Sequence, residues 1–255
     1  MQKKQAVNYI ELVGREWGIP RAPFLATVNC LEKDLMTGWR CEYEFSAVEG
    51  QRSLRFLHLS FPGRRFHQRR MLGFTVQREK SAKAVIGNFF GRKENWDKSR
   101  LDEFFIFNRK FGPWPIQLGL EMEAAGRRKA KIYLSVNGAF SLAAFCADFN
   151  FIWPEKFKAG RFDSVALDLD SDLGCGFKFY PLSDPDSGRL WRFDKNGRPI
   201  GSAKRWKRYR SGLEGTAWQR LNFRFPEFIV KFIKDEKLSI SYLCRESGRR
   251  SFYFR

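Results

Sequence analysis

The sequence predicts an α+β protein in which antiparallel strands close into one barrel with a polar lumen and helices outside. Residues 127–136 alternate in character, so that Lys131 and Tyr133 share one face of an extended chain and apolar residues the other. The same Lys-x-Tyr unit returns at Lys178 and Tyr180. Helices and hairpins also alternate along the chain, and such meanders can close into a barrel with every helix outside. For either strand alone, a half-solvated sheet with protective edge lysines is the simpler interpretation.

The N-terminal part of the chain predicts two helices followed by a hairpin. Apolar residues recur at helical spacing in 3–16, and Pro23 opens a second helix that continues to about residue 31. Polar and apolar residues then alternate through 39–48, and turn residues lead into a second strand over 54–61. Residues 71–77 are compatible with either a helix or a strand.

The rest of the chain repeats this order of helices and hairpins. A helix over 99–110 ends before Pro113, which cannot continue it. Residues 184–210 are polar and rich in Gly, Lys and Arg, which predicts a long excursion from the core. The remaining predicted elements are a hairpin of 116–123 and 127–136, a helix over 139–149, a hairpin of 162–170 and 176–181, a helix after Pro226, and a last hairpin of 238–244 and 249–255.

Composition and charge restrict the class of protein. At 255 residues, with 43% hydrophobic and 16% aromatic residues, the chain is a folded globular protein that can bury its core as one large domain or two small ones. The net charge of +19 predicts an anionic partner, such as nucleic acid, a membrane surface or a phosphorylated small molecule. Five scattered cysteines indicate neither a disulfide framework nor a zinc site. The polar N-terminus and the lack of a long apolar segment predict a cytoplasmic protein with no membrane partner.

Four stretches resemble the ABBA-type aromatic prenyltransferases, in particular the cyanobactin (ribosomal peptide) prenyltransferase branch. They are the hairpin leading into Lys129-Ala130-Lys131-Ile132-Tyr133-Leu134, the strand from Gly176 to Tyr180, the early strand Leu54-Arg55-Phe56-Leu57 and the tyrosine-bearing terminal hairpin. The resemblance covers most of the chain in order and spacing, although this chain is more charged and somewhat short. It implies a closed antiparallel barrel of about ten strands surrounded by helices, the ABBA or PT-barrel fold, as one domain over 1–255 of a monomeric enzyme.

The resemblance also implies an activity and a set of site residues. The activity is transfer of a dimethylallyl or geranyl group from its diphosphate to a peptide side chain (Tyr, Trp or Arg) or an aromatic small molecule. Basic side chains in the lumen would bind the diphosphate, and tyrosines would shield the allylic cation from water. Carried over by position, the diphosphate-binding set is Arg55, Lys131, Lys178 and Arg249, and the cation shield is Tyr133, Tyr180, Tyr242 and Tyr253. No cofactor is expected beyond the prenyl diphosphate, with Mg²⁺ as an optional addition.

An acceptor that loses a proton needs a base, and the resemblance implies a glutamate on the first strands. The candidates are Glu42 and Glu44. An ion pair with Arg40 or Arg55 explains these carboxylates equally well. His58 lies in a basic stretch and is interpreted as incidental to function.

Two other groups of residues suggest binding sites. Asp168, Asp170 and Asp172 are spaced so that their carboxylates could converge on a cation, but counter-charges for nearby lysines explain them better. We therefore expect no metal held by the protein. The run at 204–210 interleaves aromatic and cationic residues, as single-strand nucleic-acid binders do, although a solvated loop is the simpler interpretation. It supports the alternative function, a non-catalytic basic nucleic-acid-binding protein.

Overall fold

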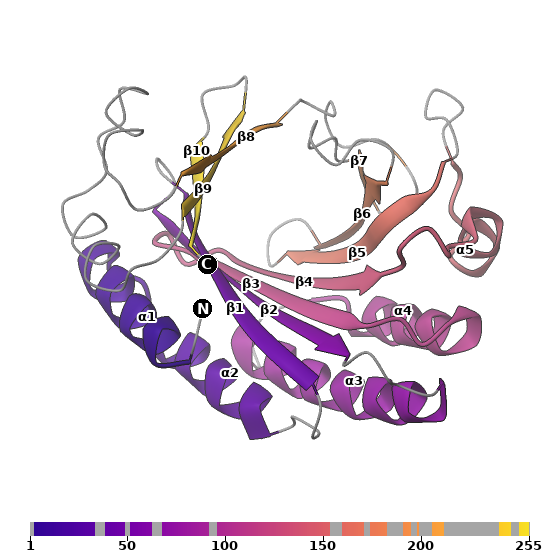
Figure 1. Ribbon diagram of the computed structural model, residues 1–255, viewed down its shortest axis with the longest axis horizontal. Coiled ribbons are helices and arrows are strands. Elements are labelled where there is room, and N and C mark those ends of the chain that lie inside the picture. Colours follow the sequence, from indigo (N-terminus) through magenta and orange to yellow (C-terminus); the bar gives the residue numbers. More distant parts are fainter. Residues whose placement is uncertain are drawn as a thin grey trace.

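In the computed structural model the chain forms a curved antiparallel sheet with helices packed on its convex side (Figure 1). The described residues are 3–33, 39–48, 52–62, 68–91, 96–153, 160–170, 174–182, 191–194, 198, 206–211, 240–245 and 250–254. Their helices are α1 (Lys3–Trp17), α2 (Ala22–Lys33), α3 (Gln68–Phe90), α4 (Lys98–Phe111) and α5 (Leu142–Asp148). Their strands are β1 (Trp39–Val48), β2 (Ser53–Pro62), β3 (Ile116–Glu123), β4 (Arg128–Ser135), β5 (Phe162–Asp170), β6 (Gly174–Pro181), β7 (Trp191–Asp194), β8 (Trp206–Ser211), β9 (Ile240–Arg245) and β10 (Arg250–Phe254).

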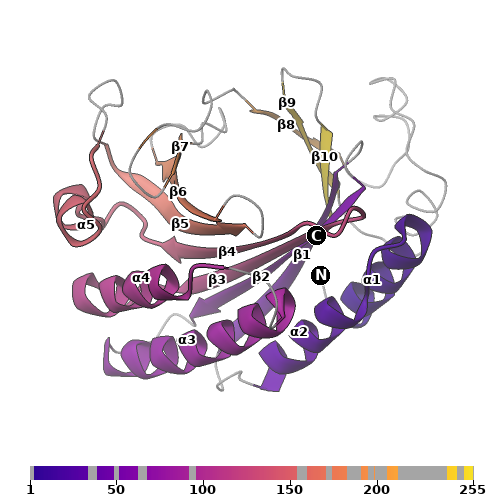
Figure 2. The same ribbon diagram turned by 180° about the vertical axis from the view of Figure 1, so that it is seen from behind.

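The sheet is open, so the predicted closed barrel is wrong. Its strands pair in the order β7-β6-β5-β4-β3-β2-β1-β10-β9-β8. The two ends of this order are β7 and β8, and no pairing within the described residues joins them. Seen from behind, the two ends stand on opposite sides of the concave face (Figure 2). Closure depends on strand tilt and stagger, which the alternation of residues along single strands does not determine.

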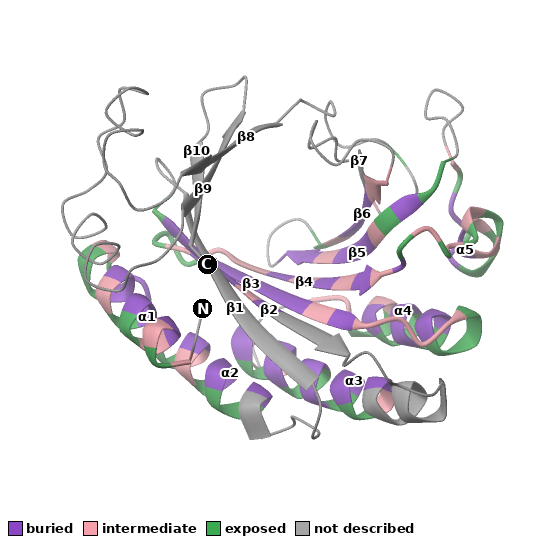
Figure 3. Cartoon of the chain, viewed as in Figure 1, coloured by how far each residue is buried: buried purple, intermediate pink, exposed green. Residues whose placement is uncertain are grey.

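The apolar residues of the strands pack under the helices, as their alternation predicts. Ala130, Ile132 and Leu134 of β4 are fully buried, whereas the intervening residues of that strand are only partly buried. Figure 3 shows this alternation along β4, whereas β3 is buried along most of its length. On the helix side, α1 buries Ile10 and Val13, which lie on one face because a helix repeats every 3.6 residues. The residues that alternate with the apolar residues of β4, among them Lys129, Lys131 and Tyr133, are thereby turned to the concave face.

Three predicted segments differ from the structure or fall outside it. The ambiguous residues 71–77 are helical and belong to α3. The expected excursion over 184–210 is wrong in part, because β7 and β8 lie within it. Phe193 of β7 is fully buried and pairs with Phe177 of β6, so this apolar residue anchors the short strand. The helix predicted after Pro226 lies outside the described residues.

Aromatic side chains fill the space between α4, α5 and the strands β5 to β7. The ring of Phe145 on α5 lies 4.9 Å from Phe177 and 5.3 Å from Phe179, centroid to centroid, and 5.5 Å from Phe107 on α4. The high phenylalanine content of the sequence thus supplies the core on the convex side of the sheet. This packing fixes the positions of β5 and β6, which carry polar residues on their opposite face.

A buried polar contact lies between β2 and α3. His58 and Arg78 are both buried, and the Arg78 guanidinium donates a hydrogen bond to Nδ1 of His58. Burial, and then the positive charge of Arg78, hold the pKa of His58 well below its ordinary value. The imidazole is therefore neutral and accepts a hydrogen bond, which makes His58 a structural residue of the helix-facing side.

This contact predicts a loss of stability in mild acid. The unfolded chain protonates His58 near pH 6.5, whereas the folded chain resists protonation, so the free energy of unfolding should fall as the pH drops below about 6.5, by up to ~1.4 kcal/mol per pH unit. Urea unfolding at pH 7.0 and 5.5 measures this slope. Replacing His58 with Asn should make the slope smaller, and an unchanged slope in that variant would contradict the assignment.

Candidate anion-binding site on the concave face

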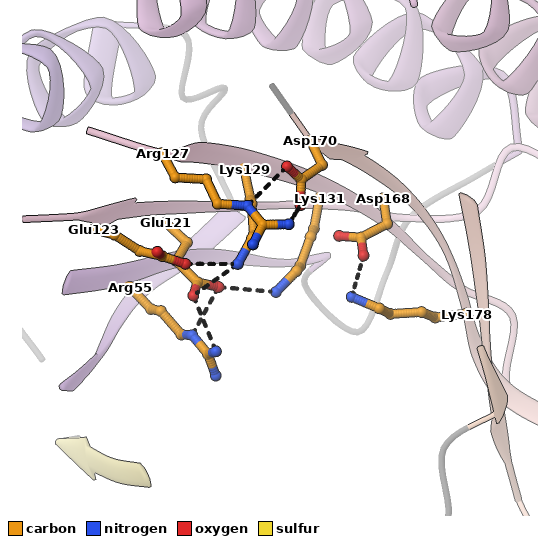
Figure 4. Close-up of polar contacts among 9 residues, drawn as sticks. All are labelled: Arg55, Glu121, Glu123, Arg127, Lys129, Lys131, Asp168, Asp170 and Lys178. Carbon is orange, nitrogen blue, oxygen red and sulfur yellow. Dashed lines mark hydrogen bonds and ion pairs between the residues drawn. The ribbon is translucent and has the colours of Figure 1, made fainter. Parts of the chain in front are cut away.

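Polar side chains of β2 to β6 gather on the concave face of the sheet, away from the helices (Figure 4). Directly opposite residues on neighbouring antiparallel strands share a face. Arg55 is opposite Glu121, Glu121 is opposite Lys129, and Lys129 is opposite Asp170. Opposite charges therefore alternate across four strands. This register places the predicted residue Arg55 beside groups from β3, β4 and β5.

Glu121 is the carboxylate at the centre of this cluster. Arg55 approaches it with two nitrogens, Nε at 2.8 Å from Oε2 and a terminal nitrogen at 3.0 Å from Oε1. Nζ of Lys131 donates to Oε2 at 3.2 Å, and Nζ of Lys129 lies 3.7 Å from Oε1. Lys129 also pairs with Glu123 at 2.9 Å. One carboxylate thus fixes the positions of three cations.

The charges of this cluster keep Glu121 and Lys131 ionised. Burial alone would raise the pKa of Glu121, but Arg55, Lys131 and Lys129 outweigh it and hold the pKa well below its usual range. Burial would lower the pKa of Lys131, but Glu121 and then Asp168 outweigh it and raise the pKa. Both groups are therefore charged at neutral pH although their side chains are only 2% and 15% exposed.

Two further ion pairs extend the cluster toward β6. Lys178, whose side chain is 8% exposed, pairs with Oδ2 of Asp168. Arg127 contacts both oxygens of Asp170, at 3.1 and 2.8 Å. The nine residues drawn in Figure 4 comprise five cations and four carboxylates, so the cluster is nearly neutral as a whole. Most of the net charge of +19 consequently belongs to other parts of the chain.

Two of the predicted tyrosines lie next to these lysines. The rings of Tyr133 and Tyr180 are 5.9 Å apart, centroid to centroid. Between their strands lies Ala166, which is opposite both Tyr133 and Lys178 and leaves space above it because its side chain is a single methyl group. Burial, and then the Tyr133 phenol, raise the pKa of Tyr180 well above its ordinary value. The Tyr180 phenol is therefore neutral, and its hydroxyl group can donate a hydrogen bond.

Gly119 allows Tyr133 to lie over the neighbouring strand. Gly119 lies on β3, opposite Lys131 of β4. A Cβ atom at this position would lie 3.3 Å from Cε2 of Tyr133 and 3.6 Å from Cβ of Lys131. The 3.3 Å distance to the Tyr133 ring is shorter than ordinary van der Waals contact. The absence of a side chain at Gly119 therefore helps to set the position of the Tyr133 ring.

The other predicted site residues are placed only by their backbone, or not at all. The register of β1 to β4 places Glu44 in one line across the sheet with Lys131, and we call such a line of opposite residues a row. Glu44 is three strand spacings, or ~14 Å, from Lys131, and Glu42 lies two residues further from the turn between β1 and β2. Tyr253 is in register with Ser46 and so shares the row of Arg55, whereas Tyr242 is in register with Phe252 and occupies the opposite face. Arg249 lies outside the described residues.

The structure also draws attention to residues to which the sequence analysis gave no catalytic or binding role. Glu121 organises three cations, and its only signal in the sequence was its position on the polar face of a predicted strand. Asp168 pairs with Lys178, as the counter-charge interpretation predicted, whereas Asp170 pairs with Arg127 and not with a lysine. The third aspartate of the possible metal group, Asp172, is not described, and the described residues contain no group of three metal-ligating side chains.

The central position of Glu121 predicts a large effect on stability. Replacing Glu121 with Gln leaves three cations without their shared counter-ion and should lower the free energy of unfolding by ~3 kcal/mol. Glu123→Gln, which affects only the contact with Lys129, should cost ~1 kcal/mol or less. Urea unfolding at neutral pH compares the two variants. Equal losses would show that Glu121 is an ordinary ion-pair partner.

Comparison of the sequence with protein-family models and with curated proteins gives no match. The resemblance to the ABBA-type prenyltransferases therefore remains a prediction from the quoted residues. Among the described residues, no helix is both long enough and apolar enough to cross a membrane.

Proposed function

We propose that the chain transfers a dimethylallyl or geranyl group from its diphosphate to an electron-rich acceptor. The acceptor is a Tyr, Trp or Arg side chain of a peptide or an aromatic small molecule. The observation that carries this proposal is the convergence of Lys131, Lys178, Tyr133 and Tyr180 on one face of three adjacent strands. The resemblance described above supplies the reaction, and the geometry supports a place for its anionic leaving group.

In this proposal the lysines stabilise the departing diphosphate. As the allylic carbon–oxygen bond breaks, negative charge develops on the diphosphate, and ammonium groups already in position stabilise it without reorganisation. Lys131 and Lys178 suit this role because neighbouring carboxylates hold them in place and their side chains are largely removed from water. Arg55, fixed by Glu121, is the third cation of the set, and Arg249 remains a sequence-based candidate.

The tyrosines would shield the allylic cation. An aromatic face attracts a cation by ~0.5–2 kcal/mol, depending on how far water is excluded. Tyr133 and Tyr180 present two rings next to the lysines, and Tyr253 shares a face with Arg55 by register. Tyr242 is less suitable, because it is in register with Phe252 and so lies outside the row of Arg55 and Tyr253. The base that accepts the acceptor's proton is proposed to be Glu44, which shares the row of Lys131, or Glu42.

The proposal also includes the setting of the reaction. Cys30, Cys146 and Cys175 are free thiols, which suits the reducing cytoplasm that the sequence analysis expected. The protein is proposed to act as a monomer and to need no protein-bound metal. Assays should be run with and without Mg²⁺, because a diphosphate donor can bind this ion itself.

The direct test replaces Lys131 or Lys178 with Ala. Either change should weaken binding of dimethylallyl or geranyl diphosphate and slow turnover by ~10²–10³, the usual loss when one preorganised contact is removed. Tyr133→Phe should have a smaller effect because the ring remains. Donor binding is measured by calorimetry, and transfer to Tyr, Trp and Arg peptides and to aromatic acceptors by mass spectrometry.

The matched control is Lys110→Ala, which removes an exposed lysine paired with Asp148 on the convex side. It should leave donor binding unchanged. Wild-type affinity and turnover in both concave-face variants would contradict the site assignment. Absence of donor binding and of any mass gain in the wild-type protein would contradict prenyl transfer itself.

The charge distribution favours a second candidate, nucleic-acid binding without catalysis. The concave cluster is nearly neutral, so it does not account for a net charge of +19. Part of the aromatic and basic run at 204–210 forms β8, an edge strand of the sheet. This candidate predicts that oligonucleotide affinity falls steeply with salt, and that replacing Lys204, Arg205 and Lys207 with Ala makes the salt dependence shallower. Unchanged salt dependence in that variant would exclude this run as the binding surface.

A further inference from the structure

Asp168 lies at the centre of the proposed diphosphate site. On β5 it is directly opposite Lys131 of β4 and Gly176 of β6. Gly176 leaves room for the backbone of β7, since a Cβ at this position would lie 2.5 Å from the carbonyl oxygen of Phe193. Lys178 lies two residues further along β6. Lys178 forms an ion pair with Oδ2 of Asp168.

The groups around Asp168 are those that bind an oxyanion. Its negative charge acts on Lys131, whose pKa it helps to raise, and on the phenol of Tyr180. Two ammonium groups and a neutral hydroxyl are hydrogen-bond donors, and phosphate oxygens use the same donors as carboxylate oxygens. The Asp168 carboxylate therefore occupies the position that an anionic ligand of Lys131 and Lys178 would take.

We infer that Asp168 is an internal counter-ion that the diphosphate displaces from these two lysines. The inference rests on the proposed function and adds a residue that limits the affinity of its donor site. A largely buried lysine without a counter-charge is destabilising, and Asp168 supplies that charge to Lys178 and adds to the charge of Glu121 beside Lys131 while the site is empty. A bound diphosphate supplies that counter-charge itself, and the carboxylate then only repels it. Asp168 thus stabilises the free protein at the expense of ligand affinity.

Asp170 provides a matched comparison on the same strand and the same face. Arg127 contacts both of its carboxylate oxygens, so Asp170 is satisfied by a partner outside the proposed site. Replacing either aspartate with asparagine changes the net charge of the protein equally. Asp168, in contrast, is opposite Lys131 in the register and forms an ion pair with Lys178.

The experiment measures binding of inorganic diphosphate by calorimetry in 0.15 M salt. Asp168→Asn should bind it about tenfold more tightly than the wild-type protein, because one repulsive charge next to the ligand has gone. Asp170→Asn should stay within about twofold of wild type. In the double variant Asp168→Asn/Lys178→Ala the gain should largely disappear, because the lysine released by the first change is missing.

Several outcomes would overturn the inference. They are unchanged or weaker binding in Asp168→Asn, an equal gain in Asp170→Asn, and no binding of diphosphate by any form of the protein. Thermal unfolding verifies that each variant is folded. If Asp168→Asn does not fold, Asp168→Ser removes the same charge and carries the same expectation.

The same measurement separates this inference from the proposed reaction. Inorganic diphosphate carries no isoprenyl group, so its binding does not depend on turnover. Tighter binding by Asp168→Asn without transfer from any prenyl donor would reject prenyl transfer and retain the counter-ion. Transfer by the wild-type protein with no gain in Asp168→Asn would reject the counter-ion and retain the transferase.

Discussion

The burial of charge on the concave face is the constraint that organises this part of the molecule. A cation removed from water is destabilising unless a carboxylate or another acceptor lies against it. Glu121 meets this requirement for Arg55, Lys131 and Lys129 together, and it does so because β2, β3 and β4 bring the four residues into neighbouring register positions. The apolar core on the convex side, which includes Phe56, Leu120 and Ile132 of these strands, holds them in place. Packing on one face thereby fixes the electrostatic arrangement on the other.

The cluster differs from a simple basic patch in ways that matter for ligands. Its cations are ordered and partly dehydrated before a ligand arrives, which favours recognition of a compact, highly charged anion over loose attraction of a polymer. Its carboxylates nearly cancel that charge, so affinity depends on how far a ligand replaces them. The tyrosine pair adds aromatic surface next to the cations. A small organic diphosphate combines the features that such a surface can bind, an anionic end and an apolar group.

The sequence predicted the local structure well, and the assembly only in part. Alternation along β4 placed Lys131 and Tyr133 on one face, and the repeat at Lys178 and Tyr180 predicted their convergence. The sequence pattern could not reveal that Glu121 is the ion-pair partner of three cations, because this depends on the register between strands that are distant in sequence. Nor could it determine whether the sheet closes, since closure depends on stagger and tilt summed over every strand. Residues 71–77 stayed ambiguous because their side chains fit both periodicities, and tertiary packing decides in favour of α3.

The most direct test of this account is an experimental structure of the protein with inorganic diphosphate or a non-reactive prenyl diphosphate analogue. The account predicts the diphosphate on the concave face, within hydrogen-bond distance of Lys131 and Lys178, with the Asp168 carboxylate turned away from Lys178 and the apolar group beside Tyr133 and Tyr180. A diphosphate bound elsewhere, with the pair between Lys178 and Asp168 intact, would contradict it.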